Sequence, residues 1–199
     1  MAGLTGVFGG TFDPPHLGHS ILSDEARAEL GLDLVLWVVT AQPPHKTDRA
    51  ITDIALRWAM AEAAVADEPA FQLSRADVDR PGPHYAVGTL DWLREHGHDQ
   101  LAYIMGSDSL RDLPSWHEPQ AFAEACSQIV VMRRPGSTVD LDDLERSIPG
   151  LTAKVRFLDA PYVGITGHDI RRRVKETRAY RYLVRPGVAR FIEESGLYR

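Results

Sequence analysis

Residues 4–19 read Leu-Thr-Gly-Val-Phe-Gly-Gly-Thr-Phe-Asp-Pro-Pro-His-Leu-Gly-His. An apolar run, a glycine-rich turn and a segment with two histidines follow one another, which predicts a strand, a tight turn and the start of a helix. A helix N-terminus offers unpaired N–H groups and the positive end of the helix dipole, and both favour phosphate. His16 and His19 are three residues apart, so they project from the same side of the first turn. The stretch therefore predicts a polyphosphate site.

Apolar runs alternate with amphipathic segments along the rest of the chain. This pattern predicts an α/β fold with a doubly wound, Rossmann-like parallel sheet covered on both faces. We expect a single domain over residues 1–199, with C-terminal helices between 166 and 197 packed on the sheet edge. The predicted strands are 4–8, 33–39, 71–77, 101–105, 127–132 and 155–158. The predicted helices are 16–29, 53–66, 85–95, 120–125, 141–148 and 185–197.

Composition limits the classes of function. The net charge of −6 and the pI of about 5.7 argue against a broad surface for nucleic acid or an anionic membrane, so affinity for anions must come from a local site. Cys126 is the only cysteine, which excludes an internal disulfide and a four-cysteine zinc site. No apolar stretch approaches the roughly 18 residues that span a bilayer, and the first residues lack the pattern of a signal peptide. We expect a cytoplasmic protein.

Two common phosphate-binding motifs are absent. Neither the lysine loop of P-loop hydrolases nor the dinucleotide fingerprint Gly-x-Gly-x-x-Gly follows the first predicted strand. The pair His16 and His19 around Gly18 instead resembles the HxGH nucleotidyltransferase superfamily. Further landmarks, in order along nearly the whole chain, are similar to the bacterial nicotinate-nucleotide adenylyltransferase family: 43–46 (Pro-Pro-His-Lys), 74–75, 82–85 (Gly-Pro-His-Tyr), 89–90, 106–110, Trp116, 134–136, 188–192 and 197–198.

The resemblance implies transfer of an adenylyl group from ATP to the phosphate of nicotinate mononucleotide, with release of pyrophosphate. The implied catalytic residues are His16, His19, Lys46 and Arg171, and whether Lys46 contacts ATP or the acceptor stays open. The implied ATP-binding residues are Gly9, Gly10, Thr11, Phe12, Gly18, Gly106, Thr166, Gly167, His168 and Ile170. We expect Mg2+ to arrive with ATP, held mostly by phosphates and water; no protein metal site is expected.

For the acceptor, the resemblance implies stacking of the pyridine ring on Trp116 and contacts of Asp108 with ribose hydroxyls. The segment 84–86 would frame the pyridine carboxylate, with backbone donors there and near His117. The implied acceptor-binding residues are His45, Tyr85, Ala86, Asp108, Trp116, His117 and Arg134.

The chain departs from the family pattern at two places. Ala86 stands where the family has threonine, so a hydroxyl contact is lost. Thr166, Gly167 and His168 replace a Ser-Ser-Thr segment that supplies hydroxyls to the distal ATP phosphates. Because histidine titrates near neutral pH, His168 is expected to make ATP affinity depend on pH. With fewer hydroxyls there, His16 and His19 are expected to supply a larger share of the contacts with the triphosphate.

Other interpretations of the same residues remain open. His16 and His19 could be metal ligands together with His45, Trp116 could be a core residue, and Asp108 could cap the helix after Gly106. His45 and Lys46 could form an exposed turn. The basic run 171–181 is interpreted as solvated surface apart from Arg171, and 77–80 as surface charges at a strand end.

The expected partners are therefore ATP and nicotinate mononucleotide, without nucleic acid or membrane. Nicotinamide mononucleotide or phosphopantetheine as acceptor, and a catalytically silent nucleotide-binding protein, remain alternatives. The sequence leaves the oligomeric state open, a homo-oligomer included.

Overall fold

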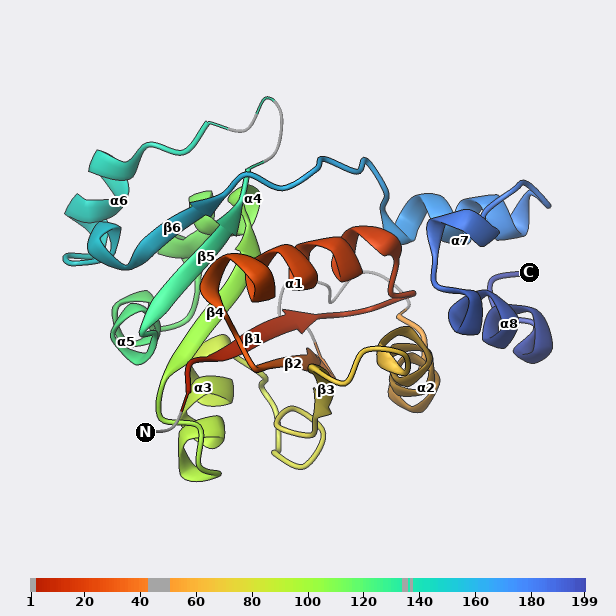
Figure 1. Ribbon diagram of the computed structural model, residues 1–199, viewed down its shortest axis with the longest axis horizontal. Helices are drawn as coiled ribbons and strands as arrows, with labels where there is room; N and C mark the ends of the chain where they lie inside the picture. The colour runs from red at the N-terminus through yellow and green to blue at the C-terminus, as the bar shows by residue number, and fades with distance from the viewer. Residues whose placement is uncertain (1–2, 43–50, 134–135, 137) are drawn as a thin grey trace.

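A computed structural model describes residues 3–42, 51–133, 136 and 138–199. Six strands form one parallel sheet in the order β3-β2-β1-β4-β5-β6 (Figure 1). They are β1 (Thr5–Gly10), β2 (Leu34–Val39), β3 (Phe71–Ser74), β4 (Leu101–Gly106), β5 (Gln128–Met132) and β6 (Val155–Leu158). The predicted parallel sheet is confirmed. Strand β3 ends three residues earlier than expected, because the Arg75 carbonyl accepts hydrogen bonds from the amides of Val78 and Asp79 and turns the chain.

Helices connect the strands and cover both faces of the sheet. They are α1 (Leu17–Leu30), α2 (Ile54–Val65), α3 (Ala86–Glu95), α4 (Ser107–Arg111), α5 (Pro119–Ala125), α6 (Leu141–Ser147), α7 (Gly167–Lys175) and α8 (Pro186–Ser195). Local signals set several ends. Asp53 caps α2 by accepting from the Ala55 amide at 2.8 Å, Gly31 ends α1 with a φ of 62°, and Pro186 opens α8.

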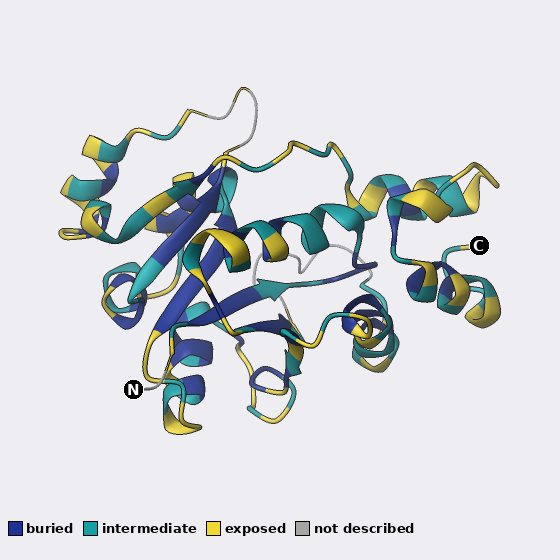
Figure 2. Ribbon diagram, in the orientation of Figure 1, coloured by how far each residue is buried: buried dark blue, intermediate teal, exposed yellow. Residues whose placement is uncertain are grey.

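The sheet divides the core into two apolar layers. Phe8 and Trp37 face one layer with α1, α2 and α8, whereas Val7 and Leu36 face the other with α3 and α5. Neighbouring residues of one strand therefore point to opposite faces, as the pleat of a strand requires. The strands of the sheet centre are buried over most of their length (Figure 2), which explains their apolar runs.

The C-terminal helices lie at the end of the molecule toward which β1 points (Figure 1). Helix α8 buries Val188, Ala189 and Ile192 and packs against α2, so it reaches the sheet through that helix. Ile170 anchors α7 in the same apolar layer. Within the described residues, no helix is long and apolar enough to cross a membrane.

The strand order places β1 and β4 side by side in the middle of the sheet. The chain winds outward in opposite directions from these two strands, so no crossover covers their carboxyl ends. A crevice forms at such a reversal, and ligands of doubly wound folds bind there.

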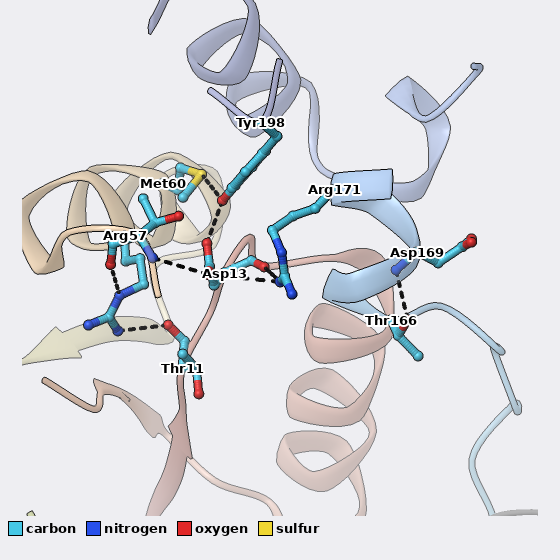
Figure 3. A network of polar contacts seen from close by, with 9 residues as sticks. Thr11, Asp13, Arg57, Met60, Thr166, Asp169, Arg171 and Tyr198 are labelled. Carbon is cyan, nitrogen blue, oxygen red and sulfur yellow. Dashed lines mark hydrogen bonds and ion pairs between the residues drawn. The ribbon is translucent and has the colours of Figure 1, made fainter. Parts of the chain in front are cut away.

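A buried arginine ties the loops at this crevice together. The guanidinium of Arg57, on α2, is 1% exposed and donates to four carbonyls: Thr11 at 2.9 Å, Thr40 at 2.8 Å, Ala41 at 2.9 Å and Thr52 at 2.7 Å. Burial lowers the pKa of Arg57, and nearby Asp13 and Asp53 oppose that shift. Figure 3 shows its contact with Thr11, which continues the glycine-rich turn.

Replacing Arg57 with methionine should lower the free energy of unfolding by about 3–5 kcal/mol, because four part-buried carbonyls lose their charged donor at once. Urea denaturation of wild type and variant measures this loss. Arg94→Met is the matched control: among the described residues Arg94 donates to a single carbonyl, that of Ala125, so its loss should cost about 1 kcal/mol. An Arg57→Met loss no larger than the control's would contradict the assignment.

Candidate active site

A cavity of about 660 Å³ opens at the carboxyl ends of β1 and β4. The ends of these strands form its floor, and the first turns of α1, α3 and α7 border it. The following residues predicted for the site line this cavity: Gly9, Gly10, Thr11, Phe12, His16, Gly18, His19, Tyr85, Ala86, Gly106, Trp116, His117, Thr166, Gly167, His168 and Arg171. Segments far apart in the sequence therefore meet where the strand order predicted a ligand.

Some predicted residues lie elsewhere. Ile170 does not line the cavity: its side chain is fully buried in the core beneath α7 and anchors the helix, so a side-chain contact with ATP is not available and its role in ATP binding stays a prediction. Asp108 is not among the lining residues, and its carboxylate lies 3.3 Å from Arg111 on α4. The cap of α4 is Gly106, so Asp108 is not the N-cap residue either. His45, Lys46 and Arg134 fall outside the described residues.

The two histidines form a stacked pair at the start of α1. Their ring centroids are 3.6 Å apart with an interplanar angle of 22°. His16 is the N-cap residue, and its amide donates to Nδ1 of His19 at 3.0 Å, so a neutral His19 carries its proton on Nε2. Gly18 leaves room for this packing, since a Cβ there would lie 3.1 Å from His16 Nδ1, a tight contact. The predicted projection from one side of the turn is thus observed as ring-to-ring contact.

Phe12 contributes only its backbone to the glycine-rich turn that borders the cavity. Its side chain is 1% exposed and stacks on Trp37 with centroids 4.8 Å apart. Its φ of 48° is left-handed, an uncommon conformation for a residue with a bulky side chain. The ring therefore pins the glycine-rich turn to the core, and a direct side-chain contact with ATP is not available.

The first turn of α7 lines the cavity next to the glycine-rich turn that precedes α1. The Thr166 hydroxyl caps this helix by accepting from the Asp169 amide at 3.1 Å. A Cβ on Gly167 would lie 2.7 Å from the Asp13 carbonyl oxygen, so glycine here permits the close approach of two backbones. His168 is exposed and lines the cavity. Gly167 therefore does more than remove a hydroxyl: it also lets α7 pack closely against the glycine-rich turn.

Arg171 and Asp13 join α7 to that turn. Nη1 of Arg171 donates to the Asp13 carbonyl at 2.5 Å and lies 3.8 Å from Oδ2 of its carboxylate (Figure 3). Asp13 also lines the cavity, and its side chain is 7% exposed. Sequence reasoning did not single out Asp13, although its place between the turn and His16 was visible.

The remaining basic residues around α7 are largely neutralised by neighbours. Asp169 pairs with Arg173 at 2.8 Å and with Arg172, and these hydrogen bonds lower the pKa of Asp169. Further pairs join Arg178 to Glu176 and Arg181 to Glu193. Within 171–181, all of it described, Arg171 alone lines the cavity. This arrangement agrees with a solvated basic surface rather than a nucleic-acid footprint.

Aromatic side chains build the wall on the α3 side. Tyr85 and His117 are stacked with centroids 4.0 Å apart. Trp116 lines the cavity while its edge packs on Phe122 at 5.2 Å and Tyr103 at 6.2 Å, so it is both a partial core residue and a cavity residue. Such a wall offers flat faces to a planar ring.

The N-terminus of α3 lies beside this wall and borders the cavity. Tyr85 is its N-cap residue and gives no side-chain hydrogen bond to the helix, and Ala86 is its first helical residue. The amides of the first turn have no partner within the helix, and the helix dipole adds partial positive charge. The arrangement favours a carboxylate.

A buried polar set beneath this wall corrects the expectation of surface charges at 77–80. Asp77 is 3% exposed and accepts from the Thr89 hydroxyl at 2.7 Å and from Arg80 at 3.1 Å. Asp79 alone fits the expectation, since it pairs with Arg75 at the surface. Burial lowers the pKa of His84, which keeps this imidazole neutral at pH 7. The position of Asp77, just past the carboxyl end of a strand, was the signal available in the sequence.

Comparisons with known proteins agree with this geometry. The cytidylyltransferase-like family model matches residues 7–173. A protein of Thermomicrobium roseum named "Probable nicotinate-nucleotide adenylyltransferase" is 46% identical over 98% of this chain and 91% of its own length, and one of Thermus thermophilus with the same name is 43% identical over 98% of both. The fold matches that of Plasmodium falciparum nicotinic acid mononucleotide adenylyltransferase complexed with NaAD, with a TM-score of 0.79, 17% identity, and coverage of 98% and 97%. The chain belongs to the cytidylyltransferase-like family and, within it, to the nicotinate-nucleotide adenylyltransferases.

Proposed function

We propose that the protein joins ATP to nicotinate mononucleotide, forming nicotinate adenine dinucleotide and releasing pyrophosphate. One observation carries the proposal: a single cavity contains a stacked histidine pair at the N-terminus of α1 and an aromatic wall at the N-terminus of α3. The first suits a triphosphate and the second suits a planar ring with a carboxylate. The relatives with this name match nearly the full chain, which supports the same activity.

The chemistry asks for positioning and charge neutralisation. The second pKa of a phosphate monoester is about 6, so the acceptor phosphate is largely dianionic at neutral pH and needs no general base. It attacks the α-phosphorus of ATP, the bond to the bridging oxygen breaks, and pyrophosphate leaves with the electron pair. His16, His19, Arg171 and the start of α1 lie in one cavity, where they can neutralise charge on the phosphoryl oxygens.

Mg2+ belongs to the proposal as the companion of ATP. Among the described residues, no three histidine, cysteine or carboxylate side chains cluster as a metal site would require. Phosphate oxygens and water would therefore supply most of the coordination, as Mg2+ commonly accepts. When bound, the ion would withdraw charge from the leaving pyrophosphate. A cytoplasmic location also remains part of the proposal.

A product assay tests the activity directly. Incubation with ATP, Mg2+ and nicotinate mononucleotide should release pyrophosphate and give the dinucleotide by mass. The kcat/KM should be lower with nicotinamide mononucleotide, because helix amides and the helix dipole favour a carboxylate over a carboxamide. Equal values for both acceptors would remove the specificity claim. ATP binding without turnover on any acceptor, phosphopantetheine included, would favour a silent nucleotide-binding protein.

Replacing His19 with alanine should lower kcat by about 10²- to 10³-fold, the usual effect of removing one donor from a developing charge. Steady-state rates at saturating substrates measure it. His96→Ala is the control: His96 is exposed at the end of α3, stacks on Trp92 and should leave the rate unchanged. A rate for His19→Ala within threefold of the control would contradict a role for the histidine pair.

A further inference from the structure

Tyr198, which follows α8, reaches the rim of the triphosphate site. Its hydroxyl donates to Oδ1 of Asp13 at 2.7 Å, across 185 residues of sequence (Figure 3). The backbone at Tyr198 has a left-handed φ of 66°, just after Gly196 ends the helix. Burial, together with the bond to Asp13, raises the pKa of Tyr198, so the phenol keeps its proton. It is therefore a neutral donor at every physiological pH.

Asp13 receives donors from three parts of the chain. Besides Tyr198, the Thr52 amide approaches Oδ2 at 3.3 Å, and Arg171 lies 3.8 Å from the same oxygen. The principal bond of Arg171 goes to the backbone carbonyl of Asp13 instead, at 2.5 Å. A nearly buried carboxylate needs such donors, since desolvation of its charge is costly. Tyr198 meets part of this need without contributing a positive charge.

The hydroxyl is not needed to dock the C-terminal helix. Helix α8 already packs on α2 through Val188, Ala189 and Ile192, which are at most 2% exposed. The same region contains another tyrosine–carboxylate contact, from Tyr180 to Glu193 at 3.4 Å, and Tyr180 does not line the cavity. Of these two contacts, only that of Tyr198 involves a cavity residue, Asp13, whose carbonyl also accepts a hydrogen bond from Arg171.

We propose that Tyr198 is a positioning residue for ATP: by satisfying Oδ1 of Asp13 it keeps that carboxylate from drawing the Arg171 guanidinium into a closed ion pair. Without the hydroxyl, the charged donor that the described residues place closest to this carboxylate is Arg171, 3.8 Å from Oδ2. Its guanidinium would turn toward the carboxylate and away from the triphosphate. The proposal rests on the function assigned above, in which Arg171 contacts ATP phosphates.

The Tyr198→Phe variant tests it, because phenylalanine keeps the ring and removes only the donor. The Kd for ATP, measured by calorimetry without acceptor, should rise about 5- to 20-fold, as expected for one charge-assisted contact. The KM for nicotinate mononucleotide should stay within twofold. Tyr180→Phe is the matched control and should leave both values unchanged. An unaltered Kd in Tyr198→Phe, or an equal rise in the control, would overturn the proposal.

Two double variants separate positioning from general destabilisation. In an Arg171→Ala background, Tyr198→Phe should not weaken ATP binding further, whereas a merely structural role would lower affinity by the same factor in both backgrounds. In an Asp13→Asn background, the neutral amide cannot capture Arg171, so adding Tyr198→Phe should change the Kd less than twofold. A full additional loss in either background would refute the mechanism.

Thermal melting and turnover keep the outcomes distinct. Melting curves show whether each variant is folded, and the Asp13→Asn pair still tests the mechanism if Tyr198→Phe alone is unstable. A wild type that binds ATP but never turns over nicotinate mononucleotide would refute the proposed function. In that case the Kd values for ATP would still test the proposed role of Tyr198.

Discussion

A parallel sheet whose order reverses between β1 and β4 must leave the carboxyl ends of those two strands without a covering crossover. Everything at the candidate site depends on this constraint. The glycine-rich turn leaves β1 there, and Gly106 ends β4 there. The apolar layers on the two faces then bring α1 and α3 to opposite sides of one opening. A site that must contact two nucleotides is thus supplied by topology before any polar side chain is considered.

Backbone polar groups at this opening need partners from outside the strands. Arg57 supplies one answer, since a single planar guanidinium holds four carbonyls from the loops after β1 and β2 and before α2. The close approach of Gly167 to the Asp13 carbonyl supplies another, because it brings the N-terminus of α7 against the same turn. The glycine-rich turn is therefore held by core contacts on one side and by the C-terminal helices on the other.

The sequence predicted most of the fold because its signals are local. Runs of apolar and β-branched residues located all six strands, and the motif 9–19 located the histidine pair and the turn. Contacts between distant residues carried no such signal. Nothing near Tyr198 indicates that it bonds to Asp13, and the position of Asp77 at a strand end does not by itself indicate that its carboxylate is buried. The pattern around Gly167 indicated a lost hydroxyl, whereas a close backbone contact also constrains that position.

Positive charge is confined to one part of the cavity because most other cations near it are paired with carboxylates. The chain carries a net charge of −6, yet anions meet a cavity with Arg171, two histidines and the N-termini of α1 and α7. Asp169 binds Arg172 and Arg173 on the outer side of α7, so these cations are directed away from the cavity. On the acceptor side, Arg80 pairs with Asp77 and His84 stays neutral, which leaves helix amides and aromatic faces to discriminate among ligands. Under the proposed function, this arrangement draws a strongly charged triphosphate to one side of the opening, while the other side recognises a planar ring by shape and hydrogen bonding.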